Sequence, residues 1–478
     1  MHGNGTARLT HEIACPQSLS ELTARLMPAH RAPQCIEHVA VLRRPVTTSE
    51  TRSNALRRSR GVIRAGLVAW LVLLGANAVS PSVAAAQDKP DAALDIAARE
   101  VASRACSAMK QRVDAFAGDG PVLLRSYDAA EGGGEIDVPA LRTAAFTYDN
   151  ALAVIALQAC GHRAEAIRIG AALERAALHD TRLRNTYRAG TVGDTALPNG
   201  WWDAAQNRWV EDGYQSGTAT GNVAWAALAL LALHDTSADA RWRTAATKLA
   251  TWVVANTRDA RADGGFSGGV DGFDAAPVKL GWKSSEHAID LMAVFGRLAD
   301  AKATGNWREH AAHARRFLDS QWDEDSGHFW IGTLPDGRTS NRATSALDVQ
   351  WWSQLLPDAP ARWRRAMRHA EHVHAVGAGF DFNDDRDGEW LEGTAQAALA
   401  YRVAGEASAA RRCLVEIATQ FSAGGYVFAT REPRITTGLA IGPASTSADA
   451  YYHRWPHLGA TAWAALAALD RNPFRAQR

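Results

Sequence analysis

The sequence predicts an all-α protein whose main domain is an (α/α)6 barrel over residues 90–475. Three observations predict this fold. Six alanine- and leucine-rich runs recur along the chain, with starts about 45 to 75 residues apart. Amphipathic, arginine-rich segments alternate with these runs. Strand signals are sparse and limited to short pieces such as "GYVFAT".

The six runs are the expected inner helices. A helix that is apolar nearly all round is buried on both sides, which is the environment inside a ring of other helices. The predicted inner helices cover residues 148–160, 221–233, 285–299, 347–356, 392–404 and 458–469.

The amphipathic segments are the expected outer helices, each with one face toward solvent. An opening helix over about 91–117 completes the sixth pair. Four outer helices end in a glycine followed by an aromatic residue, as expected where glycine stops a helix. An open α-solenoid is the alternative, but solenoid repeats are regular and short, whereas these loops are long and rich in Gly and Trp. The other outer segments are 162–178, 240–255, 306–322, 361–375 and 407–421.

The N-terminal part has the pattern of an export signal. Four arginines from Arg57 to Arg64 precede an apolar run, and Ala84 and Ala86 form a small-residue cleavage site. We therefore expect a signal peptide over 57–86 and a periplasmic or secreted protein. The run is shorter than the ~20 residues of a membrane span, so an uncleaved anchor is the less favoured alternative. Residues 1–56 lack apolar periodicity and are expected to be a non-native or disordered extension.

Charge and cysteine content exclude several classes of partner. Residues 1–86 contain ten arginines and four glutamates, so without them the totals of 52 basic and 51 acidic side chains become 42 and 47. This mildly acidic balance argues against nucleic acid or anionic membrane as a partner. Beyond residue 86 only Cys106, Cys160 and Cys413 remain, without metal-ligand spacing. Cys106 and Cys160 form either a disulfide or two buried thiols.

The starts of the inner helices are the expected functional region. In such a barrel these N-terminal ends converge on one face, here called the mouth. Four starts carry a carboxylate, namely Asp149, Glu286, Asp348 and Glu392. Taken singly, an acid in a first turn is more often a helix-stabilising residue than a catalyst.

Aromatic residues and histidines accompany these acids. Tryptophan stacks on the apolar face of a sugar ring while acids and histidines bind its hydroxyls, so the pattern indicates a carbohydrate ligand. Trp225, Trp242, Trp252 and Trp463 lie inside helical runs and are assigned to the core. The candidate substrate-binding residues are Tyr148, Trp201, Trp202, Trp282, His287, Trp351, Trp390, His453, Trp455 and His457.

The motifs at the inner helices carry a resemblance to a known group. "YDNALAVIAL", "ATGNVAWAALALL", "SSEHAIDLMAVF", "EWLEGTAQAALAY" and "WPHLGATAWAALAAL" resemble the six-hairpin glycosidase superfamily. The resemblance covers almost the whole chain after residue 90 and matches no single family closely. It implies a glycoside hydrolase with one protonated and one ionised carboxylate at the mouth. Glu392, after Trp390 and Leu391, is the candidate general acid and Asp149 its ionised partner; Glu286 and Asp348 are the substitutes.

Other functions on the same fold stay open. A sugar epimerase would use His287, His453 or His457 as acid and base. A polysaccharide lyase would use Tyr148 or a histidine as base, with Arg454 or Lys283 neutralising a uronate. The alternative from a different functional class is a barrel that binds a glycan without catalysing a reaction.

No cofactor is expected, and calcium is a weaker possibility. Asn383, Asp385, Asp387 and Gly388 match the first half of a calcium loop. Thr394 stands where that loop requires a glutamate.

Overall fold

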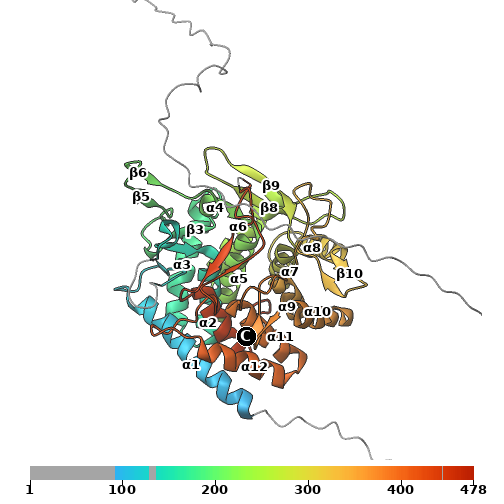
Figure 1. The fold of residues 1–478 in the computed structure, drawn as a ribbon. Helices are drawn as coiled ribbons and strands as arrows, with labels where there is room; N and C mark the ends of the chain where they lie inside the picture. Colours follow the sequence, from blue (N-terminus) through green and yellow to red (C-terminus); the bar gives the residue numbers. More distant parts are fainter. Residues whose placement is uncertain (1–91, 129–135, 444, 478) are drawn as a thin grey trace, which may run out of the picture. The chain divides into compact units, whose positions relative to one another are not determined.

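The computed structural model describes residues 92–128, 136–443 and 445–477 (Figure 1). The expected signal peptide over 57–86 and the extension over 1–56 lie outside the described residues. None of the described helices is long and apolar enough to cross a membrane.

Six inner helices form a closed ring, as predicted. Each packs against the next in chain order, and the last packs against the first. Their interior positions are almost fully buried, which accounts for their apolar composition. The inner helices are α2 (Thr147–Ala159), α5 (Thr220–Ser237), α7 (Ser285–Asp300), α9 (Leu347–Leu355), α11 (Leu391–Ala404) and α13 (Leu458–Ala468).

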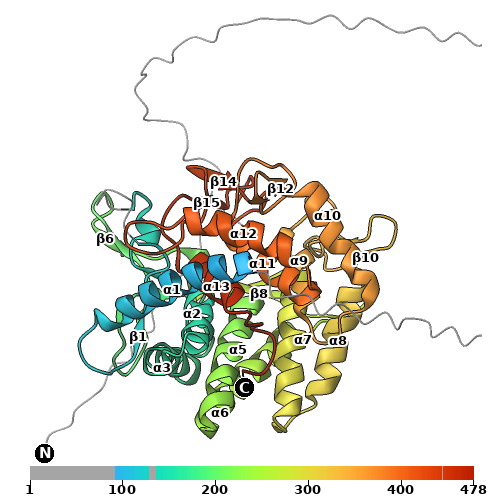
Figure 2. The same ribbon diagram turned by 90° about the horizontal axis from the view of Figure 1, so that it is seen from below.

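Six outer helices surround this ring, and each packs against an inner helix. The opening helix α1 (Ala92–Asp114) packs on α13, so it completes the sixth pair as the sequence predicted. Figure 2 shows the pairs α5 with α6 and α7 with α8 side by side. The other outer helices are α3 (Arg163–His179), α6 (Ala240–Thr257), α8 (Trp307–Ser320), α10 (Arg365–Val373) and α12 (Ala407–Thr419).

Short antiparallel strands occupy the connecting loops and are more numerous than the sequence indicated. β7, β8 and β9 form a three-stranded sheet, and the other strands form two-stranded ones. The hairpins β5–β6 and β8–β9 extend beyond the helices in Figure 1. Their bounds are β1 (Val122–Leu123), β2 (Ala144–Phe146), β3 (Thr186–Arg188), β4 (Gly190–Thr191), β5 (Trp201–Asp203), β6 (Arg208–Val210), β7 (Thr218–Ala219), β8 (Ser267–Asp271), β9 (Val278–Lys283), β10 (Trp322–Asp323), β11 (His328–Phe329), β12 (Ala375–Val376), β13 (Gly379–Phe380), β14 (Arg434–Thr436) and β15 (Tyr451–His453); short helices cover Pro139–Leu141, Gly213–Ser216 and Ala361–Arg364.

Aromatic side chains fill the barrel below the mouth. The Trp225, Trp352 and Trp463 rings, from α5, α9 and α13, have centroids 5.3 to 5.8 Å apart. Phe474, in the C-terminal segment, packs against Trp225 and Trp352 at 5.4 and 5.8 Å. These large buried rings close the interior, so the mouth has a floor one helical turn below the helix starts.

A disulfide joins Cys106 to Cys160, with the Cα atoms 5.7 Å apart. It connects α1 to the residue that ends α2 and so ties the first outer helix to the first inner one. The structure thus selects the disulfide from the two alternatives that the sequence left open. Cys413 is a buried free thiol on α12.

Candidate active site

Glu392 lies at the mouth, in the first turn of α11, and is 1% exposed. The Tyr148 hydroxyl on α2 donates a hydrogen bond of 2.6 Å to Glu392 Oε1. That hydroxyl accepts one of 2.9 Å from Trp463 Nε1 on α13. Residues from three inner helices therefore orient this carboxylate. Burial raises the pKa of Glu392 to about 7, against the opposing effects of His457 and the Tyr148 hydrogen bond.

His457 lies between Glu392 and Asp149. Its Nε2 is 3.4 Å from Asp149 Oδ2, and its Nδ1 is 3.6 Å from Glu392 Oε2. His457 is also the N-cap of α13, where Nδ1 accepts from the Ala460 amide at 3.3 Å. Burial alone would lower the pKa of His457, but the neighbouring Asp149 and Glu392 carboxylates raise it.

Gly459 leaves the space in which these three side chains meet. A Cβ at this position would lie 2.7 Å from Asp149 Oδ1, 2.8 Å from Glu392 Oε2 and 2.9 Å from His457 Cε1. Such distances are well inside van der Waals contact, so the arrangement requires glycine. A glycine in an alanine-rich helix start was a visible signal that the sequence interpretation missed.

Three further carboxylates, those of Glu286, Asp290 and Asp348, lie close enough to influence the pKa of at least one neighbour. Burial, with Asp348 and Glu392 nearby, raises the pKa of Glu286 well above its ordinary value. Burial and the nearby Glu286 and Asp348 also raise the pKa of Asp290, one turn further along α7, well above its ordinary value. Burial raises the pKa of Asp348 to about 7. The four acids named from the sequence are thus brought together, and Asp290 joins them.

Hydrogen bonding distinguishes these acids. Asp348 Oδ1 accepts from the Val349 amide at 2.7 Å. Both oxygens of Asp290 are buried without a hydrogen-bond partner among the described residues. No described residue donates a hydrogen bond to Glu286, which is partly exposed at the mouth. Glu286 therefore lacks a hydrogen-bond donor of the kind that Tyr148 gives Glu392.

The structure corrects the assignment of two tryptophans to substrate binding. Trp351 is fully buried and packs against Phe380 and Tyr401, in the core. Trp390 is 2% exposed and packs on Phe382 and Tyr452. The aromatic ring that floors the mouth from α9 is Trp352, four residues after Asp348 and so on the same helix face.

The other candidate binding residues occupy different places. Trp282, on β9, lies 5.6 Å from the His287 ring and is partly exposed. Trp202 is 58% exposed on the hairpin β5–β6, opposite Trp209, while Trp201 is partly exposed. His453 and Trp455 stack on each other at 4.4 Å.

His287 is buried at the start of α7, and the Ser284 hydroxyl caps this helix by accepting from the His287 amide. The His287 ring lies against Gly221 of α5, because a Cβ there would be 2.8 Å from His287 Nε2. Burial lowers the pKa of His287 to about 4, so the imidazole is neutral at physiological pH.

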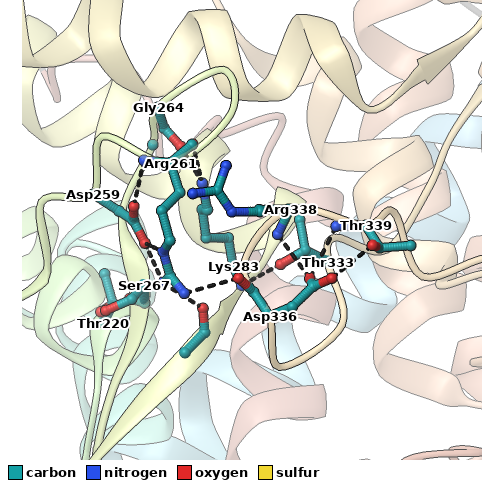
Figure 3. A network of polar contacts seen from close by, with 12 residues as sticks. Thr220, Asp259, Arg261, Gly264, Ser267, Lys283, Thr333, Asp336, Arg338 and Thr339 are labelled. Atoms are coloured by element: carbon teal, nitrogen blue, oxygen red, sulfur yellow. Dashed lines mark hydrogen bonds and ion pairs between the residues drawn. The ribbon is translucent and has the colours of Figure 1, made fainter.

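The cations proposed for a lyase serve the scaffold instead. Lys283 Nζ donates to the carbonyls of Arg261 and Gly264 at 2.8 and 2.7 Å, within the loop network of Figure 3. Arg454 donates to the Thr430 and Arg431 carbonyls at 3.1 and 2.9 Å. Neither is placed to neutralise a uronate at the mouth, so the structure removes this support for a lyase.

An acidic cluster does occur in the loop with the calcium-like sequence. Oxygens of Asp381, Asp385 and Asp387 all lie within 4.8 Å of one another. Asp381 takes the place that Asn383 was expected to fill. Asp385 and Asp387 also accept hydrogen bonds from Thr436 on β14, so the cluster already links two loops. Calcium at this place stays a prediction.

Comparison with known proteins establishes the fold. No family model and no curated protein matches the chain. Among solved structures, one titled "Glycosidase Wild Type" has a TM-score of 0.54 and 12% identity, covering 78% of this chain and 97% of that one. The cellobiose 2-epimerase from Spirochaeta thermophila DSM 6192 has a TM-score of 0.54 and 14% identity, covering 79% and 97%. A sugar epimerase from a ruminal bacterium has a TM-score of 0.54 and 11% identity, covering 77% and 98%.

These likenesses cover nearly the whole length of each neighbour. The protein has the same fold as these glycosidase and sugar epimerase structures, in agreement with the barrel that the sequence predicted. Glycosidases and sugar epimerases share this fold, so the fold alone does not choose between the two reactions.

Proposed function

We propose that the protein is a glycoside hydrolase that acts on an oligo- or polysaccharide, with Glu286 and Glu392 as its two carboxylates. The observation that carries this proposal is the contrast between their surroundings. Glu392 accepts from Tyr148 and faces His457, groups that stabilise an anion. Burial and the neighbouring Asp348 and Glu392 carboxylates favour the protonated form of Glu286.

Glycoside hydrolysis needs one protonated and one ionised carboxyl group in such unlike environments. In the proposed reaction Glu286 donates its proton to the glycosidic oxygen as the C–O bond breaks. Glu392 attacks the anomeric carbon or removes a proton from the attacking water. These roles reverse the expectation from sequence, in which the aromatic neighbour Trp390 made Glu392 the acid; the Trp390 ring packs elsewhere.

Asp149 has a different role in this proposal from the one first expected. The His457 imidazole lies between Asp149 and Glu392. A glycosidic bond therefore cannot lie between these two carboxylates, and Asp149 acts through His457. The nearby Asp348 supports the protonated form of Glu286.

Export to the periplasm or the exterior belongs to the same proposal. It rests on the signal-like residues 57–86 and is supported by the Cys106–Cys160 disulfide, which suits an oxidising compartment. Trp202 and Trp282, exposed or partly exposed in loops that precede inner helices, offer stacking surfaces for sugar rings.

A panel of glycans assayed for new reducing ends tests the activity. Glu392→Gln and Glu286→Gln should each lower kcat by roughly 10²-fold to 10⁴-fold. Glu389→Gln is the matched control: Glu389 is equally buried in the same "EWLE" segment, but it accepts from Thr394 and lies 3.9 Å from Arg431. Binding without new reducing ends across the panel would refute a hydrolase, and the absence of deuterium exchange as well would favour the glycan-binding barrel.

A sugar epimerase is the second candidate, because a neutral His287 lies beside Glu286 at the mouth and epimerases share the fold. This reaction moves a carbon-bound proton. In D₂O it would place deuterium on the sugar without releasing reducing ends, and His287→Asn would abolish the exchange. His457 suits the role of epimerase base less well, because both of its ring nitrogens face protein groups.

A further inference from the structure

We infer that His457 is a positioning residue that couples Asp149 to Glu392 and holds the Glu392 carboxylate in its working orientation. The sequence interpretation gave His457 to substrate binding. The coupling itself stands on geometry alone, whereas its effect on turnover rests on the proposed hydrolase function.

Protein groups enclose the His457 ring. Its two nitrogens face Asp149 and Glu392 at 3.4 and 3.6 Å, and the Tyr127 ring stacks on it at 4.7 Å with an interplanar angle of 20°. The side chain is 3% exposed. A sugar hydroxyl therefore has no free ring nitrogen to bind, which excludes direct substrate contact as the main role.

The position of Glu392 depends on this ring. Tyr148 holds Oε1, but Oε2 is buried without a hydrogen-bond partner among the described residues and faces His457 Nδ1. Protonation of the imidazole replaces the 3.3 Å bond that Nδ1 accepts from the Ala460 amide by an attraction between Nδ1–H and Glu392 Oε2. The cation then attracts both carboxylates and holds Oε2 as well. Without it, Asp149 and Glu392 would repel each other across Gly459.

The titratable groups that face His457 come from four segments. Asp149 and Glu392 are the two carboxylates, on α2 and α11. Tyr127 stacks on the ring, and Tyr452 of β15 lies 6.4 Å away. Burial raises the pKa of both phenols well above 10, so they stay neutral and the two carboxylates alone set the charge around the imidazole.

The first test uses no substrate. In protein with isotope-labelled histidine, the His457 ring resonance is assigned by its loss in His457→Gln and then titrated with pH. Asp149→Asn should lower the pKa of His457 by about one unit or more, because a close opposite charge is removed. The His313 resonance is the internal control, since this buried ring on α8 bonds the Asp259 and Gly265 carbonyls. An unchanged His457 pKa in Asp149→Asn would overturn the coupling, whatever the enzyme assay shows.

The second test applies once a hydrolysed glycan is known. His457→Gln should lower kcat by about 10-fold or more with KM nearly unchanged, and the acidic limb of the kcat profile should move to higher pH as Glu392 loses its cationic neighbour. His372→Gln, an exposed change on α10, is the control. A raised KM with unchanged kcat and pH profile would instead identify a substrate-binding residue and overturn the proposal. If His457→Gln fails to fold, the His457 resonance is assigned by its through-space contact with the stacked Tyr127 ring, and the titration of Asp149→Asn still decides.

Discussion

The substitution Gly459→Ala tests the crowded meeting of Asp149, Glu392 and His457 with a single methyl group. The added Cβ would lie 2.7, 2.8 and 2.9 Å from atoms of these side chains. Ordinary contact needs roughly 3.5 Å, so each neighbour must withdraw by about 0.6 Å or more. Overpacking of this kind costs about 1–3 kcal/mol of folding free energy. Displacing a catalytic group by such a distance lowers activity by up to about 10²-fold.

The assay compares thermal unfolding and kcat/KM of Gly459→Ala with those of Gly296→Ala. Gly296 is also inside an inner helix, α7, but a Cβ there meets nothing within 4 Å. Its replacement should stabilise the protein by about 0.5–1 kcal/mol through helix propensity and leave activity intact. Wild-type activity and stability in Gly459→Ala would refute the close packing described for this site.

Three further predictions concern stability. Cys106→Ser with Cys160→Ser should lower the free energy of unfolding by about 4 kcal/mol on chain-entropy grounds, since the bridge spans 54 residues, and calorimetry should show a lower Tm. Trp352→Ala should cost about 3–5 kcal/mol because this ring is 1% exposed, whereas Trp202→Ala at 58% exposure should leave Tm nearly unchanged. Burial raises the pKa of Glu389 from its ordinary 4.5 to about 8 in the folded protein, so the folded state loses stability relative to the unfolded state as pH rises through that interval. Glu389→Gln should therefore make Tm fall less between pH 5 and 8, and an identical pH dependence would contradict the raised pKa.

The tryptophans show how much of the site sequence patterns can predict. The pattern "QWW" predicted an aromatic residue at the mouth, and one is there. It is Trp352, on the face of Asp348, rather than Trp351. A spacing of four residues was the available signal, because side chains i and i+4 share a helix face. Trp225 and Trp463 follow Gly221 and Gly459 by the same spacing and also floor the site.

The carboxylates show the limit of such patterns. Each acid was found because first-turn acids at apolar helix starts are visible in the sequence. "EWLE" presents two equivalent glutamates, yet Glu392 enters the mouth while Glu389 turns toward Thr394 and Arg431. Which one turns inward depends on the rotation of α11 about its axis, which its packing against α9, α12 and α13 decides.

The sequence by itself determined the helical periodicity, the number and order of the inner helices, and the set of polar residues at their starts. These follow from contacts within one or two helical turns, which residue patterns encode directly. Only the tertiary structure decided that His457 lies between Asp149 and Glu392 and that Lys283 and Arg454 point into loops. Such contacts join residues tens to hundreds of positions apart, and their distances depend on how whole helices pack around the ring.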